Sequence, residues 1–287
     1  MRGIVVKNQN GYFSVAGESG VLHLCRSRGK LKRKSEILVG DTVEYELAGT
    51  EPSIIQVYPR KNCIFRPPAA NIDLLVLTVS VKTPAVNLYT LDKMLALAEN
   101  AGIRSMVCVN KADLAEEEAA RLAALYDKAG YPAVCVSAYT GEGLDRLPSF
   151  FEKGIVAFSG PSGVGKSSLL NHFLGENHME SGEVSVKTGR GKNTTRHAVL
   201  VPFDGNTFLM DTPGYTSLSV ESLSADTVSS LFPDFQSYSG SCRFRNCRHL
   251  REPGCAVREA AEEGEIVRSR YESYCQIIRE CSAVSKY

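Results

Sequence analysis

A glycine-rich loop near the middle of the chain carries the clearest chemistry in the sequence. It has the P-loop spacing and consists of Gly160, Pro161, Ser162, Gly163, Val164, Gly165, Lys166 and Ser167, followed by Ser168. An apolar run at 155–158 precedes the loop and a helical pattern follows it, which favours a P-loop over a chance glycine-rich turn. The glycines let successive N–H groups face phosphates, and the helix N-terminus adds positive potential. We expect Lys166 to reach the β and γ phosphates of a nucleotide and the Ser167 hydroxyl to bind Mg²⁺.

Two further elements have the residue types needed around a γ-phosphate. Asp211-Thr-Pro-Gly214 follows an apolar run, so the acid can hold a metal ion through water and the Gly214 N–H can contact the phosphate. Between this turn and the P-loop lies Gly-Arg-Gly-Lys-Asn-Thr-Thr at 189–195. In the switch loop of a GTPase, a threonine hydroxyl caps the magnesium ion. We assign that role to Thr195, with Thr194 as the alternative.

A second motif has the residues needed to recognise guanine. Asn110-Lys111-Ala112-Asp113 follows the apolar run 106–109. The Asp113 carboxylate can accept hydrogen bonds from guanine N1–H and the 2-amino group, whereas adenine would leave that acid unpaired. We expect Lys111 to lie along the base, Asn110 to tie this loop to the P-loop, and Ser137-Ala138 to offer N–H groups to guanine O6. Alone, the motif also fits a solvated turn, but the P-loop in the same chain favours the nucleotide interpretation.

The order of these elements is rotated along the chain. In most GTPases the P-loop comes first and the base element and Ser-Ala come last, whereas here the base element and Ser-Ala precede the P-loop. A circular permutation can leave the fold and the site unchanged when the new termini lie in a surface loop. One consequence is that a turn expected to respond to the γ-phosphate, at 211–214, leads directly into the C-terminal module.

A cluster of soft metal ligands lies in the C-terminal part of the chain. Cys242-x4-Cys247-x-His249-x5-Cys255 supplies three thiols and one imidazole, which match a closed tetrahedral zinc site. We expect one structural zinc ion to stabilise a module too small to bury its own core, and the alternative is a set of unconnected thiols. The arginines interleaved with the cluster, together with Phe244, suit contact with an RNA backbone.

A run of basic residues near the N-terminus contains no acid. Its members are Arg26, Arg28, Lys30, Lys32, Arg33 and Lys34. The run is typical either of a solubilising loop or of an RNA-binding surface. The N-terminal part of the chain is expected to form an OB-fold barrel, and such barrels commonly bind nucleic acid. We expect RNA binding.

The surrounding sequence predicts the elements that position these residues. Short runs rich in Val, Ile, Leu and Tyr predict an all-β barrel over 1–66, with an OB-fold as first choice. Pro67-Pro68 predicts a linker. Alternating strands and helices over 71–220 predict a parallel-rich α/β sheet, the circularly permuted P-loop GTPase domain. Residues 221–287 are expected to form a zinc-binding helical module that ends in one helix over 256–280.

Composition restricts the protein to a few classes. The 287 residues are 43% hydrophobic and 23% charged, as in a globular protein with sizeable cores, and the net charge of +1 argues neither for nor against nucleic acid. No apolar run reaches membrane-spanning length, and the N-terminus lacks signal-peptide architecture. We therefore expect a cytoplasmic protein that does not bind membranes and whose nine cysteines are reduced thiols or metal ligands.

The four nucleotide-site motifs, in this order, resemble the ribosome small subunit-dependent GTPase A family over essentially the whole chain. The resemblance implies an N-terminal OB-fold, a permuted GTPase domain and a C-terminal zinc domain. It also implies a bacterial factor that binds the small ribosomal subunit and its rRNA, and that hydrolyses GTP late in the maturation of that subunit, with activity stimulated by the subunit. Its cofactors would be Mg²⁺ with GTP and one Zn²⁺. We expect a monomer.

The chain departs from the family pattern at one position. A histidine often precedes the Thr-Thr pair, where it is a candidate for positioning the attacking water, but this chain has Asn193. His197 is the other candidate for that role. Tyr215 stands where many GTPases carry a glutamine, so we expect slow hydrolysis unless a partner completes the site.

Two other functions stay open from the sequence alone. One is an RNA-binding regulatory switch that responds to GTP with negligible hydrolysis of its own. The other is an ATP-using P-loop enzyme such as a kinase, against which the Asn-Lys-Ala-Asp motif argues.

Overall fold

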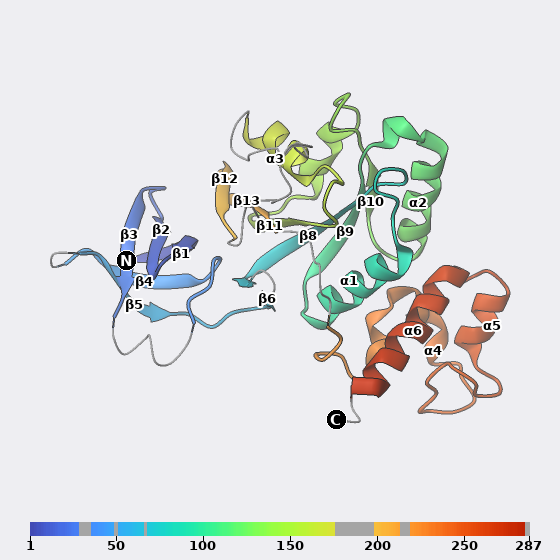
Figure 1. Ribbon diagram of the computed structural model, residues 1–287. Helices are drawn as coiled ribbons and strands as arrows, with labels where there is room; N and C mark the ends of the chain where they lie inside the picture. The colour runs from blue at the N-terminus through green and yellow to red at the C-terminus, as the bar shows by residue number, and fades with distance from the viewer. Residues whose placement is uncertain (29–35, 49–50, 66–67, 176–197, 213–218, 285–287) are drawn as a thin grey trace, which may run out of the picture. The chain divides into compact units, whose positions relative to one another are not determined.

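The computed structural model describes residues 1–28, 36–48, 51–65, 68–175, 198–212 and 219–284 (Figure 1). The chain divides into two compact units. Unit 1 combines Met1–Leu75 with Pro148–Tyr215, and unit 2 combines Val76–Leu147 with Thr216–Tyr287. Among the described residues, no helix has the length and apolar character needed to cross a membrane.

The N-terminal part of unit 1 is a closed five-stranded barrel. Its strands are β1 (Arg2–Gln9), β2 (Tyr12–Gly17), β3 (Leu22–Ser27), β4 (Thr42–Glu46) and β5 (Ser53–Val57). They pair in the order β1-β2-β3-β5-β4, and β4 closes the barrel on β1. β3 and β5 are parallel and the other neighbours are antiparallel, in agreement with the predicted OB-fold. Alternate residues point inward, so Val5, Val15 and Ile54 are fully buried in the barrel core.

Two short paired strands lie on either side of the linker that the two prolines predict. β6 (Cys63–Phe65) pairs antiparallel with β7 (Pro68–Ala70). Pro68 is tolerated because it is the first residue of its strand, where a missing N–H costs little. The linker prediction was therefore wrong at Pro68.

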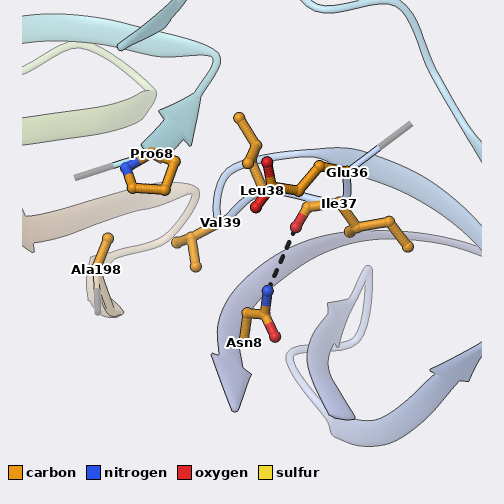
Figure 2. Close-up of a pocket in the computed structure, with 7 residues that line it drawn as sticks. All are labelled: Asn8, Glu36, Ile37, Leu38, Val39, Pro68 and Ala198. Atoms are coloured by element: carbon orange, nitrogen blue, oxygen red, sulfur yellow. Dashed lines mark hydrogen bonds between the residues drawn. The ribbon is translucent and has the colours of Figure 1, made fainter. Parts of the chain in front are cut away.

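The barrel also contacts the α/β part of unit 1. Lys7 of β1 forms an isolated antiparallel bridge with Val199, which lies just before β12 (Leu200–Asp204). Figure 2 shows the small pocket beside this bridge, where Val39 and Pro68 lie near Ala198. Asn8 Nδ2 donates to the Ile37 carbonyl at 3.4 Å on the barrel side of the pocket.

The α/β sheet has the strand order β10-β9-β8-β11-β13-β12. Its remaining strands are β8 (Ile72–Val79), β9 (Arg104–Val109), β10 (Ala133–Cys135), β11 (Gly154–Ser159) and β13 (Thr207–Asp211). β10 is parallel to β9, and β11 is parallel to β13, as predicted. β12 is antiparallel to β13 and forms a hairpin with it. The first residues of β8 belong to unit 1 and its last residues belong to unit 2.

Three helices accompany these strands, in agreement with the predicted alternation of strands and helices. α1 (Leu88–Asn100) begins after Asn87, whose side chain accepts the Thr90 N–H at 2.9 Å, as an N-cap should. α2 is Glu116–Lys128 and α3 is Lys166–Leu174. Two 3₁₀ segments, η1 (Ala112–Leu114) and η2 (Leu144–Phe150), complete this part of the fold.

The C-terminal module in unit 2 consists of short helical pieces followed by two helices. The pieces are η3 (Val228–Leu231), η4 (Pro233–Phe235) and α4 (Gln236–Ser239). The expectation of one helix over 256–280 was wrong, because α5 (Ala256–Glu262) and α6 (Arg268–Val284) are separate. Gly264 lies at φ +81° between them, in the left-handed region that ends helices and that glycine tolerates best.

A buried ion network fixes this module on α1 and α2 within unit 2. The Arg270 side chain of α6 is 1% exposed. Its Nη1 donates to Asp92 Oδ1 of α1 at 2.8 Å, and its Nη2 donates to Asp234 Oδ1 of η4 at 2.7 Å. Tyr126 of α2 donates its hydroxyl to the same Asp92 oxygen at 3.0 Å.

Candidate nucleotide site and metal centre

The predicted P-loop joins strand β11 to helix α3 in unit 1. Its tip is exposed at Pro161, Ser162 and Gly163, while Val164 is 1% exposed and anchors the loop. Gly165 precedes the helix at φ +96°, a left-handed conformation that a side chain would disfavour. The loop therefore presents its backbone at a helix N-terminus, the arrangement that binds phosphate.

Lys166 and Asp211 lie close to this loop and are both mostly buried. Lys166 Nζ donates to the carbonyl oxygens of Gly160 at 2.8 Å and Pro161 at 2.9 Å. Burial lowers the pKa of Lys166, although the Asp211 carboxylate partly opposes that change. Burial raises the pKa of Asp211, and Lys166 partly opposes it in turn. The lysine is thus folded back on the loop, positioned to turn toward an added anion.

Strand pairing places Asp211 beside the start of the P-loop. Asp211 stands opposite Phe158 in the parallel register of β13 and β11. The next residue, Thr212, donates its N–H at 3.0 Å and its hydroxyl at 2.9 Å to the Phe158 carbonyl. Asp211 Oδ1 is buried and has no hydrogen-bond partner among the described residues. An orphaned buried carboxylate oxygen fits an acid whose partner is a metal ion or its water.

The base-recognition motif lies in unit 2, at the ends of β9 and β10. Asn110 is 1% exposed, and its Oδ1 accepts the Ala138 N–H at 2.9 Å. Ala112 N–H donates to the Val136 carbonyl at 3.0 Å, so the predicted Asn-Lys-Ala-Asp and Ser-Ala loops are side by side. Lys111 adopts a left-handed conformation at φ +59° and donates its Nζ to the Thr83 carbonyl.

Asp113 and Ser137 contribute differently to this pair of loops. Asp113 Oδ1 is buried and lacks a hydrogen-bond partner among the described residues, as expected of an acid that awaits two donors. Ser137 is fully buried, and its Oγ accepts the Thr140 N–H at 3.1 Å, which closes the turn after Ser-Ala. The two loops therefore lie together at this edge of the sheet, and their role in guanine binding stays a prediction.

Several predicted site residues lie outside the described residues. In the nucleotide site they are Asn193, Thr194, Thr195, His197 and Gly214. In the basic run they are Lys30, Lys32, Arg33 and Lys34.

The two described arginines of the basic run are engaged locally. Arg26 pairs with Glu51 at 2.9 Å and stacks over the Tyr12 ring at 4.5 Å. Arg28 pairs with Glu46 at 3.0 Å. Acids distant in sequence thus partly neutralise a run that contains none itself.

The four predicted zinc ligands converge in the C-terminal module. The ligand atoms of Cys242, Cys247, His249 and Cys255 all lie within 4.8 Å of one another. His249 Nδ1 lies 3.5 Å from Cys242 Sγ and 3.4 Å from Cys255 Sγ. Tetrahedral bonds of about 2.3 Å to sulfur and about 2.0 Å to nitrogen place such ligand atoms about 3.5 Å apart. The donor set and its spacing therefore fit a structural metal site.

Residues outside the predicted ligand set support this centre. Tyr271 and Tyr274 of α6 donate their hydroxyls to the carbonyls of His249 at 2.8 Å and Arg248 at 2.6 Å. Glu252 accepts the N–H groups of three loop residues, each at 2.9 Å. Burial alone would raise the pKa of Glu252, but those backbone donors lower it to about 2. The helical pattern predicts that both tyrosines face a core, although not that they contact the metal loop, whereas nothing local marked Glu252.

Comparison with known families agrees with this geometry. The family model described as RsgA GTPase matches residues 57–221, more than half of the chain, and the RsgA N-terminal domain model matches residues 2–55. This chain belongs to the RsgA GTPase family. The predicted family resemblance and the predicted GTPase class are thereby confirmed.

Relatives in this family match over nearly the full length. The small ribosomal subunit biogenesis GTPase RsgA of Caldanaerobacter subterraneus subsp. tengcongensis is 41% identical, over 100% of this chain and 97% of the relative. The protein of the same name from Clostridium perfringens strain 13 is 40% identical, over 98% of each chain.

Solved structures of relatives confirm the fold class. YjeQ from Thermotoga maritima has a TM-score of 0.82 and 36% identity, with 98% of each chain covered. YloQ, described as a circularly permuted GTPase, has a TM-score of 0.81 and 30% identity, with 98% of this chain and 95% of YloQ covered. The rotated motif order of this RsgA-family chain therefore belongs to a fold already seen in its relatives.

Proposed function

We propose that this RsgA-family protein binds GTP through Asp113 and the P-loop, and hydrolyses it on the small ribosomal subunit late in the maturation of that subunit. The observation that carries the guanine assignment is the buried Asp113 Oδ1, which has no hydrogen-bond partner among the described residues, in a motif whose Asn110 accepts the Ala138 N–H. Guanine N1–H and its 2-amino group are the donors this acid lacks. The ribosomal assignment rests on the names of the relatives from Caldanaerobacter and Clostridium.

The phosphates would be held by the P-loop backbone and by Lys166. In this proposal Lys166 leaves the Gly160 and Pro161 carbonyls and turns to the β and γ phosphates. Ser167, Thr195 and Asp211 would hold Mg²⁺, which neutralises charge on the phosphate oxygens. The Gly214 N–H would contact the γ-phosphate.

The chain offers few side chains that could position the attacking water. Asn193 can orient water through hydrogen bonds but cannot take its proton, and His197 is the other candidate. Because Tyr215 stands where a glutamine often positions water, hydrolysis by the isolated protein is expected to be slow. Contact with the small ribosomal subunit would then complete the site.

The C-terminal cluster would hold one zinc ion. Three thiolates and one imidazole are ligands that select zinc over magnesium or calcium. Metal analysis of the purified protein should give about one zinc per chain. Cys247→Ser should lower that content and the thermal stability, while Cys63→Ser, outside the cluster, should leave the zinc content unchanged. Equal zinc content in both variants would contradict the assignment.

The RNA-binding role of the barrel, over residues 1–66, is a further part of the proposal. Reversing the charge of Lys30, Lys32, Arg33 and Lys34 together should weaken binding to the small subunit and flatten its salt dependence. Binding that is unchanged at every salt concentration would remove this role. We also propose a cytoplasmic monomer, with a GTPase domain over 71–220 and a zinc-binding module over 221–287.

GTP turnover with separated ribosomal subunits tests the proposal directly. The protein alone should turn over slowly, small subunits should accelerate it by at least about tenfold, and large subunits should not. Equal turnover with and without small subunits would contradict the proposed partner. No hydrolysis even in a single turnover with small subunits would favour the regulatory switch instead.

A further inference from the structure

Tyr139 is the most exposed large hydrophobic side chain that the structure describes. It exposes 91% of its surface, compared with 46% for Phe244 in the metal module. The Tyr139 side chain makes no hydrogen bond or ring contact with any other described residue. A single exposed aromatic ring is unremarkable by itself, so its position in the fold decides what it can do.

The backbone on both sides of Tyr139 is firmly held. Before it, the Ala138 N–H donates to Asn110 Oδ1 at 2.9 Å. After it, the Thr140 N–H donates to Ser137 Oγ at 3.1 Å and the Gly141 N–H donates to the Ser137 carbonyl at 2.8 Å. A closed turn therefore presents the ring from a fixed backbone rather than from a long loop. Less conformational entropy is lost when such a ring binds a ligand.

The ring projects from the same loop pair that contains Asp113. The Ala112 N–H donates to the Val136 carbonyl at 3.0 Å, which places residues 110–113 against residues 136–138. The buried Asp113 Oδ1, which has no hydrogen-bond partner in the part of the chain that the structure describes, can bind the edge of a purine, but Asp113 offers nothing to the flat face. An aromatic ring one residue beyond Ala138 supplies such a surface, because stacking on a base needs no hydrogen-bond match.

We propose that Tyr139 binds the purine face of the nucleotide and determines affinity, while Asp113 determines which purine is accepted. This inference rests on the proposed guanine-nucleotide function and assigns a residue that none of the motifs includes. Loss of stacking on one base weakens binding by about five- to a hundredfold. Tyr139→Ala should therefore lower the affinity for GDP, IDP and XDP by similar factors. Tyr139→Phe should bind all three nucleotides almost as tightly as the parent protein does.

The chain has no tryptophan, so Tyr139→Trp creates a single fluorescent reporter at this position. Saturating GDP should change the indole emission, and inorganic pyrophosphate, which has no base, should leave it unchanged. Leu24→Ala is a matched control, because it removes another exposed apolar side chain from the barrel, with 60% exposure. Its GDP affinity should equal that of the parent.

The results separate this inference from the proposed function. The stacking role would be overturned if Tyr139→Ala bound GDP as tightly as the parent protein does. It would also be overturned if the emission of Tyr139→Trp did not change on adding GDP, even in a protein that still prefers guanine. If Tyr139→Ala lost affinity for small subunits but not for GDP, the ring would serve RNA and the inference would be wrong. A parent protein with no preference for guanine nucleotides would instead defeat the proposed function.

Discussion

Lys166 and Asp211 illustrate how burial prepares individual residues for a charged ligand. Both side chains are titratable and mostly buried. Burial lowers the pKa of Lys166 and raises the pKa of Asp211, and each shift favours the neutral form of the side chain. Each charge partly supports the other, but Asp211 Oδ1 still has no hydrogen-bond partner among the described residues. A bound metal ion with phosphates would supply the missing partners, so the apo site bears a cost that ligand binding relieves.

Asp211→Asn tests that interpretation. The amide has nearly the same shape and no charge to desolvate, so the melting temperature of the free protein should be unchanged or slightly raised. The gain in GTP affinity on adding Mg²⁺ should be lost, and hydrolysis stimulated by small subunits should fall by at least about a hundredfold. Calorimetric titrations with and without Mg²⁺ make the measurement. An unchanged Mg²⁺ effect would contradict the role of Asp211 at the metal.

At the residue scale, the sequence predicts the candidate site residues that belong to short motifs. Lys166, Asp211 and Asp113 follow from spacing and from the strands that precede them. The sequence could not distinguish Tyr139 from any other exposed aromatic residue. Its proposed role depends on its place beside the base motif, which the hydrogen bond between Asn110 and Ala138 fixes only in the folded chain. Glu252 was missed for a similar reason, since its three backbone donors become partners only in the folded loop.

At the scale of elements, helix α6 joins the metal module to the α/β part of unit 2. Its buried Arg270 meets Asp92 of α1 and Asp234 of η4, and its guanidinium also lies 4.6 Å from the Phe232 ring centre. Removing one partner from a buried ion network leaves the remaining charges without compensation. Loss of Arg270 would therefore leave two buried carboxylates without their cation.

Arg270→Met should lower the free energy of unfolding by about 3–5 kcal/mol, because Asp92 and Asp234 stay buried without their cation. Arg268→Met on the same helix is the control. Arg268 pairs with Glu272 at 3.0 Å, but both side chains are mostly exposed, so its loss should cost at most about 0.5 kcal/mol. Urea unfolding of both variants gives the comparison. Equal losses would show that the buried network does not stabilise the module.

Glu280 gives the α1–α6 contact a pH dependence. Partial burial would raise the pKa of Glu280, but Lys93 Nζ at 2.6 Å and the Tyr89 hydroxyl lower it overall. Because the folded pKa lies below the unfolded one, this stabilisation is present above about pH 5 and is lost as the pH falls through the lowered pKa. Glu280→Gln should therefore reduce the acid sensitivity of stability, whereas the exposed Glu272→Gln should not. Thermal melts from about pH 7 to about pH 4 make the test, and identical profiles for the parent and Glu280→Gln would contradict it.

The elements that sequence predicted poorly have local physical explanations. Pro67-Pro68 indicated a break, yet Pro68 begins β7, because a proline at the first position of a strand forfeits little hydrogen bonding. The single helix expected over 256–280 is divided at Gly264, whose left-handed conformation was allowed by its residue type but not required by it. The Arg270 network joins residues 178 positions apart in the chain, beyond any local pattern.

At the scale of the whole molecule, the rotated motif order occurs in a fold that relatives share. The chain presents its base motif before its P-loop, and it has a TM-score of 0.81 with a relative described as a circularly permuted GTPase. Unit 1 contains the barrel, the P-loop and Asp211, while unit 2 contains Asp113, Tyr139 and the metal centre. The proposed function requires that Asp113 and Lys166 bind the same nucleotide.

The most direct test of that claim is the nucleotide preference of Asp113→Asn. Xanthine carries an oxygen where guanine carries its 2-amino group, so an amide at position 113 should favour XTP and a carboxylate should favour GTP. We predict that the variant loses GTP turnover stimulated by small subunits and gains XTP turnover, which Lys166→Ala in the same chain then abolishes. An Asp113→Asn variant that keeps the preference of the parent for GTP would contradict the account.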